Sequence, residues 1–342
     1  MQTLLAPEIS VKRFTAPYRV GIIATDEKFS QALIEILNQR KDVQAEWCQT
    51  SELRLNEPCP YRVIVDRLSH CFEFYQPYLK HAVLSGTYVI NNPFWFLADD
   101  KFFNYHRASQ LGVAIPRTVL LPSKEYDQRV LRPEDLHNLK TPIDWREVTR
   151  DIGFPAILKP YDGYGWREVH RVDSLDELLA VYNESMMDVM MLQEFIDFEH
   201  YVRCFVVGKK WVLPTSYNPK ERRYVVDHDH LTPELGARIV RDCQVINHAL
   251  GYDINTVEFA IRDGVPYAID FMNPVPDAKP EVISYPYFGW LVERVADLVE
   301  EIVHSDAVTP CSMGSLASQP LPEIPTLAEL TRPRSRFWAG HS

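Results

Sequence analysis

A chain of 342 residues, with 46% apolar and 24% charged residues, is long enough for about two or three globular domains. Its formal net charge of −11 argues against a nucleic-acid partner, and no window approaches the roughly 18 apolar residues of a membrane span. The six cysteines form no Cys-x-x-Cys pair, which predicts reduced thiols in a cytoplasmic protein, with neither zinc nor disulfides.

The N-terminal third of the chain alternates predicted strands and helices. Its first residues, MQTLLAPEISVKRF, lack a basic leader, so we expect no signal peptide. The expected strands are residues 18–25, 61–66, 87–91 and 117–121, and the expected helices are residues 27–39, 71–84 and 93–111. Strands separated by helices indicate a small parallel sheet. The proline- and charge-bearing segment 122–141 predicts a connection to a second unit.

The segment FPAILKPYDGYGW, residues 154–166, contains a lysine and, shortly after it, two glycines. The apolar run ends on Lys159, and the following turn contains Gly163 and Gly165. A cation at a strand end beside free backbone N–H groups is typical of a phosphate-binding site, and glycine lets the backbone approach phosphate oxygens. A solvated lysine and a plain hairpin turn would satisfy the same letters. Tyr164 and Trp166 are bulky for such a loop; they would shield phosphates from water and leave the mobility of the loop open.

The middle of the chain predicts an α/β unit followed by a hairpin and a long helix. The α/β unit comprises residues 145–153, 168–172, 174–184 and 190–196 around the strand that ends at Lys159. Strands 201–207 and 210–214 pair through Gly208-Lys209. The helix 232–250 begins with Thr-Pro-Glu and ends at Gly251, which are good start and stop signals.

Three oxygen-bearing side chains lie on a second predicted hairpin, DINTVEFAIRDGVPYAIDFMNP, residues 253–274. Asp263-Gly264 is a strong turn signal between its two strands. Glu258 lies on the first strand, and Asp270 and Asn273 lie near the end of the second. Two acids and an amide at one end of a hairpin form the all-oxygen ligand set that Mg²⁺ prefers. A phosphate-binding loop together with a magnesium site predicts a nucleoside triphosphate site.

The ordered set of motifs resembles the ATP-grasp superfamily, in particular its carboxylate–amine ligases of the D-alanine ligase, glutathione synthetase and ribosomal-protein glutamate ligase kind. The resemblance extends over roughly residues 85–303. It implies an α/β fold of the α+β ATP-grasp type, with an N-terminal parallel α/β domain, a central lid subdomain and a C-terminal subdomain. The expected units are an extension at 1–17, the N-terminal domain at 18–124, the lid subdomain at 125–196, the C-terminal subdomain with the metal site at 197–304, and a flexible or surface-wrapping tail at 305–342.

The resemblance also implies roles for individual residues. Lys101, before the strand that follows Gly-x-x-x-Pro, and Lys159 would reach the phosphates, and Arg203 would bind the transferring phosphoryl group. The hinge residues Gln193, Glu194, Phe195 and Ile196 would bond the adenine edge, with Glu194 facing the purine or ribose. Glu258, Asp270 and Asn273 would hold the metal.

Besides the bulky Tyr164 and Trp166 in the glycine-bearing loop, the chain departs from the family pattern at two places. Tyr201 stands where the family has an acid before the arginine. In the D-alanine ligase pattern the middle metal-binding acid lies two places before the asparagine, where this chain has Phe271. Because side chains alternate faces along a strand, a bulge is needed to turn Asp270 toward the metal.

The implied activity is ATP-dependent formation of an amide or peptide bond through an acylphosphate, with Mg²⁺ (or Mn²⁺) and ATP bound between the two ATP-grasp subdomains. The implied partners are a small-molecule carboxylate and an amine, an amino acid or peptide among them. We expect no nucleic-acid or membrane partner, and a homodimer is left open. A regulatory or scaffold protein without turnover, as synapsins resemble this family, and a small-molecule kinase are the alternatives.

Two further segments carry charge without a defined role. The first, residues 217–230, is expected to form a loop between the first hairpin and the long helix. Lys220, Arg222 and Arg223 could face the γ-phosphate or an acidic substrate, or form a solvated surface. The run Asp227-His228-Asp229-His230 fits no tetrahedral metal spacing. Substrate-side candidates just beyond the metal strand are Asp277, Lys279 and Glu281.

Overall fold

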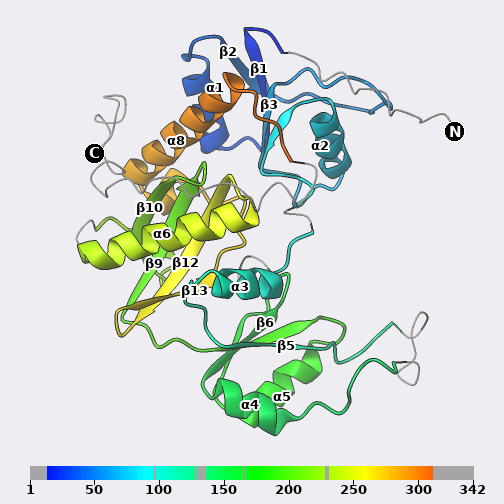
Figure 1. The fold of residues 1–342 in the computed structure, drawn as a ribbon, viewed down its shortest axis with the longest axis vertical. Helices are drawn as coiled ribbons and strands as arrows, with labels where there is room; N and C mark the ends of the chain where they lie inside the picture. The colour runs from blue at the N-terminus through cyan, green and yellow to red at the C-terminus, as the bar shows by residue number, and fades with distance from the viewer. Residues whose placement is uncertain are drawn as a thin grey trace, which may run out of the picture.

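The computed structural model describes residues 14–95, 98–127, 129, 136–163, 165, 167–227 and 231–310. Its elements form three units, which follow one another along the long axis of the molecule (Figure 1). The N-terminal unit lies at one end, the C-terminal subdomain in the middle and the lid subdomain at the other end. Within the described residues, no helix combines the length and the apolar character needed to cross a membrane.

The N-terminal unit contains a small parallel sheet, as predicted, in the order β2-β1-β3-β4. The expected strand 117–121 does not belong to it: as β5 (Thr118–Leu121) it pairs antiparallel in another sheet. Its strands are β1 (Tyr18–Ile23), β2 (Val43–Trp47), β3 (Val63–Asp66) and β4 (Tyr88–Ile90), and its helices are α1 (Lys28–Leu37) and α2 (Tyr75–Leu84). The sequence analysis missed β2. This edge strand buries Val43 and Ala45 but exposes Gln44, so it has no continuous apolar run.

The lid subdomain is a four-stranded sheet in the order β5-β8-β6-β7. Its strands are β5 (Thr118–Leu121), β6 (Ala156–Pro160), β7 (His170–Val172) and β8 (Met190–Glu194), and its helices are α4 (Trp145–Ile152) and α5 (Leu175–Glu184). Leu158, Leu178 and Leu192 belong to the core between this sheet and its helices. Because side chains alternate along a strand, Lys159 and Gln193 lie on the opposite face.

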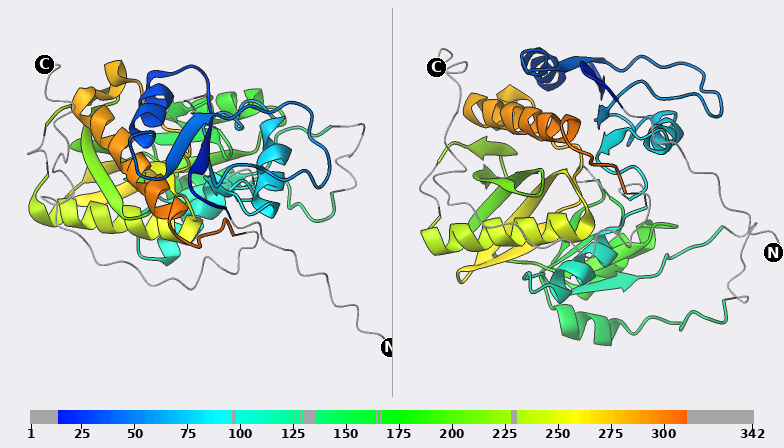
Figure 2. Two further views of the ribbon diagram at one scale, coloured as in Figure 1. Left: turned by 90° about the horizontal axis from the view of Figure 1, so that it is seen from above. Right: turned by 45° about the horizontal axis from the view of Figure 1, so that its top comes forward.

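The C-terminal subdomain is a five-stranded antiparallel sheet in the order β11-β10-β9-β12-β13. Its strands are β9 (His200–Val207), β10 (Trp211–Asn218), β11 (Arg223–Val225), β12 (Ile254–Arg262) and β13 (Val265–Asp270). The helices α6 (Pro233–Leu250) and α8 (Tyr285–Val303) pack against it, and the short α7 (Pro280–Ile283) precedes α8. Helix α8 also packs against α1, so it lies between the N-terminal unit and the sheet of the C-terminal subdomain (Figures 1 and 2).

Local signals in the sequence set several boundaries. Gly208 and Lys209 both have positive φ (61° and 61°), as do Asp263 and Gly264 (53° and 70°), which matches the two predicted hairpin turns. Gly251 ends α6 in the left-handed conformation, with φ 71°. Helix α3 (Lys101–Gln110) is shorter than the predicted 93–111, because the Asp100 carboxylate accepts a hydrogen bond from Phe103 N and caps the helix there.

Two other expectations about elements were wrong. The predicted helix 71–84 begins at Tyr75, after a run of turns. The charged segment 217–230 was expected as a loop, but Arg223–Val225 pairs with β10 as β11. Tyr224 alone is buried in this strand, which is too short and too exposed to give an apolar pattern.

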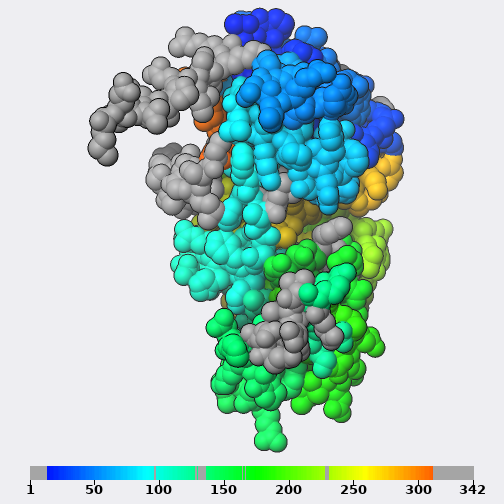
Figure 3. Space-filling view, turned by 90° about the vertical axis from the view of Figure 1, so that its right-hand side faces the viewer, coloured from blue at the N-terminus to red at the C-terminus, as the bar shows by residue number. Residues whose placement is uncertain are grey.

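The chain after α8 returns to the N-terminal unit. Arg62 donates hydrogen bonds to Ser305 O (2.8 Å) and Ala307 O (2.9 Å), and the Thr309 hydroxyl accepts from Val89 N (2.8 Å). Residues 305–310 therefore lie against the β4 side of the parallel sheet; the rest of the expected tail, 311–342, is outside the described residues. Figure 3 shows the N-terminal unit above the lid subdomain, joined by the segment that contains α3.

Candidate active site

A β-bulge places two of the predicted metal ligands opposite one another. Glu258 on β12 pairs with Asp270 on β13, whereas the next residue, Phe259, pairs with Ala268, so Ile269 is the extra residue. Directly opposed residues in an antiparallel pair present their side chains on the same face. The bulge that the sequence required is confirmed, and it brings Asp270 to the side of Glu258.

The carbonyl of the bulged residue helps to hold Lys159. A bulge leaves a backbone group outside the ladder, and Ile269 O accepts hydrogen bonds from the Tyr105 hydroxyl (2.6 Å) and from Lys159 Nζ (3.1 Å). Lys159 Nζ also donates to Tyr105 Oη (2.9 Å) and Gln193 Oε1 (3.0 Å). Burial lowers the pKa of Lys159 to about 8, even though the charge of Asp270 opposes this shift.

Lys101 reaches the same acid from the first residue of α3. Its side chain is buried, and its Nζ lies 2.5 Å from Asp270 Oδ1. Although burial acts in the other direction, the charges of Lys101 and Lys159 lower the pKa of Asp270 below its ordinary value. The structure therefore brings the two predicted phosphate-binding lysines together beside an ionised carboxylate.

Arg203 on β9 forms an ion pair with Glu258, to which it is also opposite in the sheet. The distance from its Nη2 to Glu258 Oε1 is 2.8 Å, and the Tyr201 hydroxyl donates to the other oxygen of Glu258. The guanidinium lies 4.7 Å from the ring centre of Tyr217. Against the effect of burial, Glu258 raises the pKa of Arg203, so its charge is permanent. Its Nε is buried and has no hydrogen-bond acceptor among the described residues.

Asn273 is oriented by the neighbouring strand β12. Its Nδ2 donates to Thr256 Oγ1 (2.7 Å), and its backbone N–H donates to Asn255 Oδ1 (3.0 Å). Donation through Nδ2 leaves the amide Oδ1 as the group available for a ligand. Thr256 and Asn255 were not predicted as site residues, and nothing in their sequence context distinguishes them from other strand residues.

The donor set fits Mg²⁺ better than a softer metal. Glu258, Asp270 and Asn273 offer oxygen atoms only. The part of the chain that the structure describes contains no group of three His, Cys, Asp or Glu side chains able to hold a metal, and His228, Asp229 and His230 are outside it. The unpartnered Nε of Arg203 fits an anionic group next to this site.

Two side chains of the predicted hinge, Gln193 and Glu194, have partners on other strands or at their ends. Gln193 bonds Lys159 through Oε1 and Thr118 Oγ1 through Nε2 (2.9 Å). Glu194 is held by Arg117 (2.9 Å) and Arg262 (3.1 Å), and these hydrogen bonds lower its pKa against the effect of burial. Its predicted contact with purine or ribose stays a prediction.

The other two hinge residues occupy different environments. The guanidinium of Arg171 lies 4.8 Å from the ring centre of Phe195, on the side of β6 and β7 that carries Lys159. Ile196 is buried. The adenine-binding role of both residues stays a prediction.

The glycines of the predicted phosphate loop differ in what they require. A side chain at Gly163 would meet Pro160 Cβ at 3.3 Å, so a larger residue would press on the end of β6. Gly165 has φ +66°, a conformation that favours glycine. Tyr164 and Trp166 are outside the described residues, and with them the expectation that they shield the phosphates.

The side chains of three additional charged candidates, Arg223, Asp277 and Glu281, have partners in the described structure. Arg223 pairs with Glu221 (2.5 Å), and the Lys279 backbone N–H donates to Asp277 Oδ1 (3.1 Å). Glu281 forms an exposed ion pair with Lys28 of the N-terminal unit. Glu281 therefore connects the two units, and its predicted substrate role has no support from this contact.

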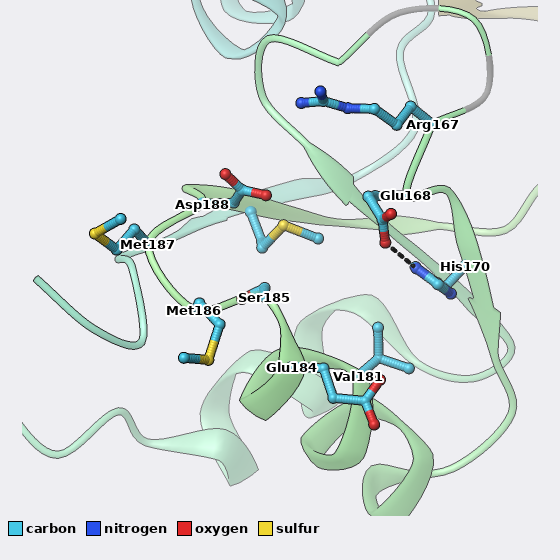
Figure 4. Close-up of a pocket in the computed structure, with 10 residues that line it drawn as sticks. Arg167, Glu168, His170, Val181, Glu184, Ser185, Met186, Met187 and Asp188 are labelled. Carbon is cyan, nitrogen blue, oxygen red and sulfur yellow. Dashed lines mark hydrogen bonds and ion pairs between the residues drawn. The ribbon is translucent and has the colours of Figure 1, made fainter.

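A pocket of about 480 Å³ lies elsewhere, on the lid subdomain. Figure 4 shows it between the end of α5 and the chain that leads into β7, with Glu168 bonded to His170 (3.2 Å). None of the predicted nucleotide or metal residues lines it. The pocket is separate from the site around Lys159.

Tyr105 is the site residue that sequence reasoning should have found. It lies four positions after Lys101 on the same helix, and residues at this spacing share a face. Its hydroxyl joins Lys159 to the bulge. A tyrosine one helical turn from a predicted phosphate-binding lysine was the available signal.

Known proteins resemble the chain in sequence and fold. No protein-family model matches it. The α-aminoadipate–LysW ligase LysX of Saccharolobus solfataricus is 27% identical, over 48% of this chain and 67% of the relative. The RimK domain ATP-grasp protein of Sphaerobacter thermophilus superposes with a TM-score of 0.57 and 19% identity, over 84% of this chain and 100% of that one. D-alanine–D-alanine ligase from Bacillus anthracis, complexed with ATP, gives 0.56 and 15%, over 86% and 97%.

These superpositions show that the chain has the ATP-grasp fold.

Proposed function

We propose that the protein is an ATP-dependent ligase that joins a carboxylate to an amine. The observation that carries this proposal is the convergence of Lys101, Lys159 and Arg203 on the acids Glu258 and Asp270, which the bulge places side by side. Phosphoryl transfer depends mainly on positioning and on charge neutralisation, and this group of cations and acids supplies both.

The proposed reaction consists of two successive displacements, first at phosphorus and then at the acyl carbon. A substrate carboxylate oxygen attacks the γ-phosphorus of ATP, ADP leaves, and an acylphosphate forms. The amine nitrogen then attacks the acyl carbon, inorganic phosphate leaves, and the amine loses a proton. Lys101 and Lys159 would bind the phosphates and Arg203 the transferring group. Glu258, Asp270 and Asn273 would hold Mg²⁺, which neutralises phosphate charge when bound.

The relatives support an amino acid or a peptide as one substrate. The names of the matched ligases specify α-aminoadipate and LysW for one, and D-alanine for the other. The cysteines in the described part of the chain are all unpaired, which is consistent with a cytoplasmic location. The bulge supports a role for Asp270 despite its departure from the family spacing, because it brings Asp270 opposite Glu258.

Trapping of the activated acyl group tests this proposal. With Mg·ATP, hydroxylamine and a panel of amino acids and short peptides, we expect a hydroxamate and a matching amount of ADP for the true carboxylate substrate. Only an activated acyl group reacts in this way, and water should not replace the acceptor in a closed site. Tight ATP binding with no hydroxamate and no acid-dependent ADP across the panel would contradict the ligase assignment.

The lowered pKa of Lys159 predicts that nucleotide binding takes up a proton in mildly alkaline solution. In the free protein its pKa is about 8, and bound phosphates should raise it toward its ordinary 10.5. Binding should therefore take up protons between these two pH values, and affinity should fall as the pH rises above about 8. Calorimetry in buffers of different ionisation enthalpy measures this uptake, which Lys159→Met should abolish.

The lowered pKa of Lys159 also predicts how the stability of the protein changes with pH. Here the folded protein is compared with the unfolded chain, not with the nucleotide complex. Because the folded protein holds the Lys159 proton less tightly than the unfolded chain, the unfolded chain binds more protons between pH 8 and 10.5. The nucleotide-free protein should thus gain stability over this range relative to Lys159→Met. Identical slopes of unfolding free energy against pH in the two proteins would contradict the assigned shift.

A further inference from the structure

The segment that follows Asn273 depends on another unit for its hydrogen bonds. Residues 273–279 contain no helix or strand, and two of them, Pro274 and Pro276, have no N–H to donate. Their carbonyl groups still require donors where they are buried. The backbone hydrogen bonds of a sheet cannot provide these donors, because β13 ends at Asp270.

The donors come from the N-terminal unit. Asn91 Nδ2 lies 3.1 Å from Pro274 O, and Arg67 Nη2 lies 3.1 Å from Pro276 O. Arg67 directly follows β3 and Asn91 directly follows β4. These strands are parallel neighbours, so their carboxyl ends lie at one edge of the sheet. That edge faces the segment beyond Asn273.

Asn91 uses all the hydrogen-bonding capacity of its amide. Its Oδ1 accepts from Asp253 N (2.7 Å) and Ile254 N (2.8 Å), and its Nδ2 donates to Ile254 O (2.9 Å) as well as to Pro274 O. The residue is 3% exposed. One side chain thus joins the start of β12 to the residue directly after Asn273.

Arg67 is held equally firmly. Its side chain is 6% exposed, it forms an ion pair with Glu27, and its guanidinium lies 4.6 Å from the ring centre of Phe29. A guanidinium that is fixed in this way presents its remaining N–H in one direction. Arg67 therefore fixes the position of Pro276 relative to the N-terminal sheet.

We propose that Arg67 and Asn91 are positioning residues that clamp residues 274–276 and thereby place the Asn273 amide for the metal. The proposal rests on the proposed Mg·ATP-dependent function. Asn91 bonds both Ile254, at the start of β12, and Pro274, the residue directly after Asn273. A ligand oxygen must be held to within about 0.5 Å for productive geometry, so the position of this segment matters for the Asn273 amide. The N-terminal unit thus acts on the nucleotide site through its bonds to residues 274 and 276.

Two variants test the clamp with two matched controls. Asn91→Asp keeps the acceptor for Asp253 N and Ile254 N but removes both donors, and Arg67→Lys keeps the charge but loses the planar fork. Tyr88→Phe removes a hydrogen bond from β4 to Asp253 (3.0 Å). Arg40→Met removes ion pairs from the N-terminal unit to Asp297 (2.8 Å) and Glu300 (3.1 Å) of α8. Neither control touches residues 274–276.

The measurements are hydrogen exchange of the 271–279 peptide in nucleotide-free protein, and the Mg²⁺ concentration for half-maximal ATP binding. We expect both clamp variants to exchange faster in this peptide and to need about 10- to 100-fold more Mg²⁺, the scale for residues that orient a metal ligand. ATP affinity without Mg²⁺ should change less than about twofold, since Lys101 and Lys159 are untouched. Both controls should match the wild type.

The outcomes separate this proposal from the proposed function. If the wild type binds ATP with Mg²⁺ but neither clamp variant changes the Mg²⁺ requirement, the clamp is wrong. Faster exchange that is equal in the clamp variants and the controls would also overturn it. If the wild type itself shows no Mg²⁺-dependent ATP binding, the proposed function fails, whereas the exchange measurement still decides whether Arg67 and Asn91 hold the segment.

Discussion

Asn273→Ala is expected to reduce Mg²⁺-dependent turnover about 100- to 1,000-fold while the protein stays folded. This is the scale of removing one electrostatic group from a transfer site. The variant loses the only side-chain oxygen of Asn273 and one hydrogen bond, to Thr256 Oγ1. Turnover should be measured as ADP release with the acid that gives a hydroxamate, over a range of Mg²⁺ concentrations.

Thr256→Val is the matched control, because it removes the same hydrogen bond and keeps the amide oxygen. It should cost about 1 kcal/mol of stability and reduce turnover far less than Asn273→Ala does. Equal turnover in Asn273→Ala and the wild type would exclude Asn273 as a ligand. Equal losses in the two variants would assign the effect to the hydrogen bond instead.

Glu258 is a less clean position for this test. It is buried and paired with Arg203 at 2.8 Å, and it also accepts from Tyr201. Glu258→Gln leaves the Arg203 charge without its partner, which typically costs about 3–5 kcal/mol for a buried pair. A loss of activity in that variant could therefore come from loss of a metal ligand, from a displaced Arg203 or from a less stable fold.

Lys159→Met is expected to weaken ATP binding by about 2–3 kcal/mol, or roughly 30- to 150-fold, because one charge-assisted contact to the phosphates is lost. Methionine retains an unbranched, apolar side chain in the buried position between Tyr105 and Gln193. Calorimetric titration with ATP in the presence of Mg²⁺ measures the difference.

Lys210→Met provides the control for a lysine outside the site, since Lys210 pairs with Glu301 at 2.6 Å near the surface. Its ATP affinity should equal that of the wild type. Unchanged affinity in Lys159→Met would remove Lys159 from the nucleotide site, and Lys101 with Asp270 would then be the next positions to test.

Much of the fold could be predicted because its signals are local. Glycine and its neighbour at positions 208–209 and 263–264 adopt positive φ, and Thr232 and Gly251 delimit α6, as the sequence indicates. These features depend on a few adjacent residues. Elements with weak local patterns were missed or misplaced: the half-exposed edge strand β2, the three-residue β11 and the start of α2.

The candidate site was predicted as a set of residue types in order, without its internal contacts. The order of the motifs along the chain and their resemblance to the family identified five candidate residues, Lys101, Lys159, Arg203, Glu258 and Asn273. It could not show that Arg203 and Glu258 are opposite one another, because strand register is set by pairing between distant segments. Helical spacing from Lys101 could have identified Tyr105 as a candidate, but its hydrogen bond to a carbonyl 164 residues away could not be predicted from the sequence.

The sequence by itself determined the two hairpin turns and the ends of α6, and it predicted an oxygen-rich ligand set, because each follows from the conformational and chemical preferences of neighbouring residues. Only the tertiary structure decided that Ile269 is the bulged residue, that its carbonyl holds Lys159, and that Arg67 and Asn91 bond the segment beyond Asn273. Buried carbonyl groups outside regular structure must find donors wherever packing brings them, and the partners that packing supplies are distant in the chain.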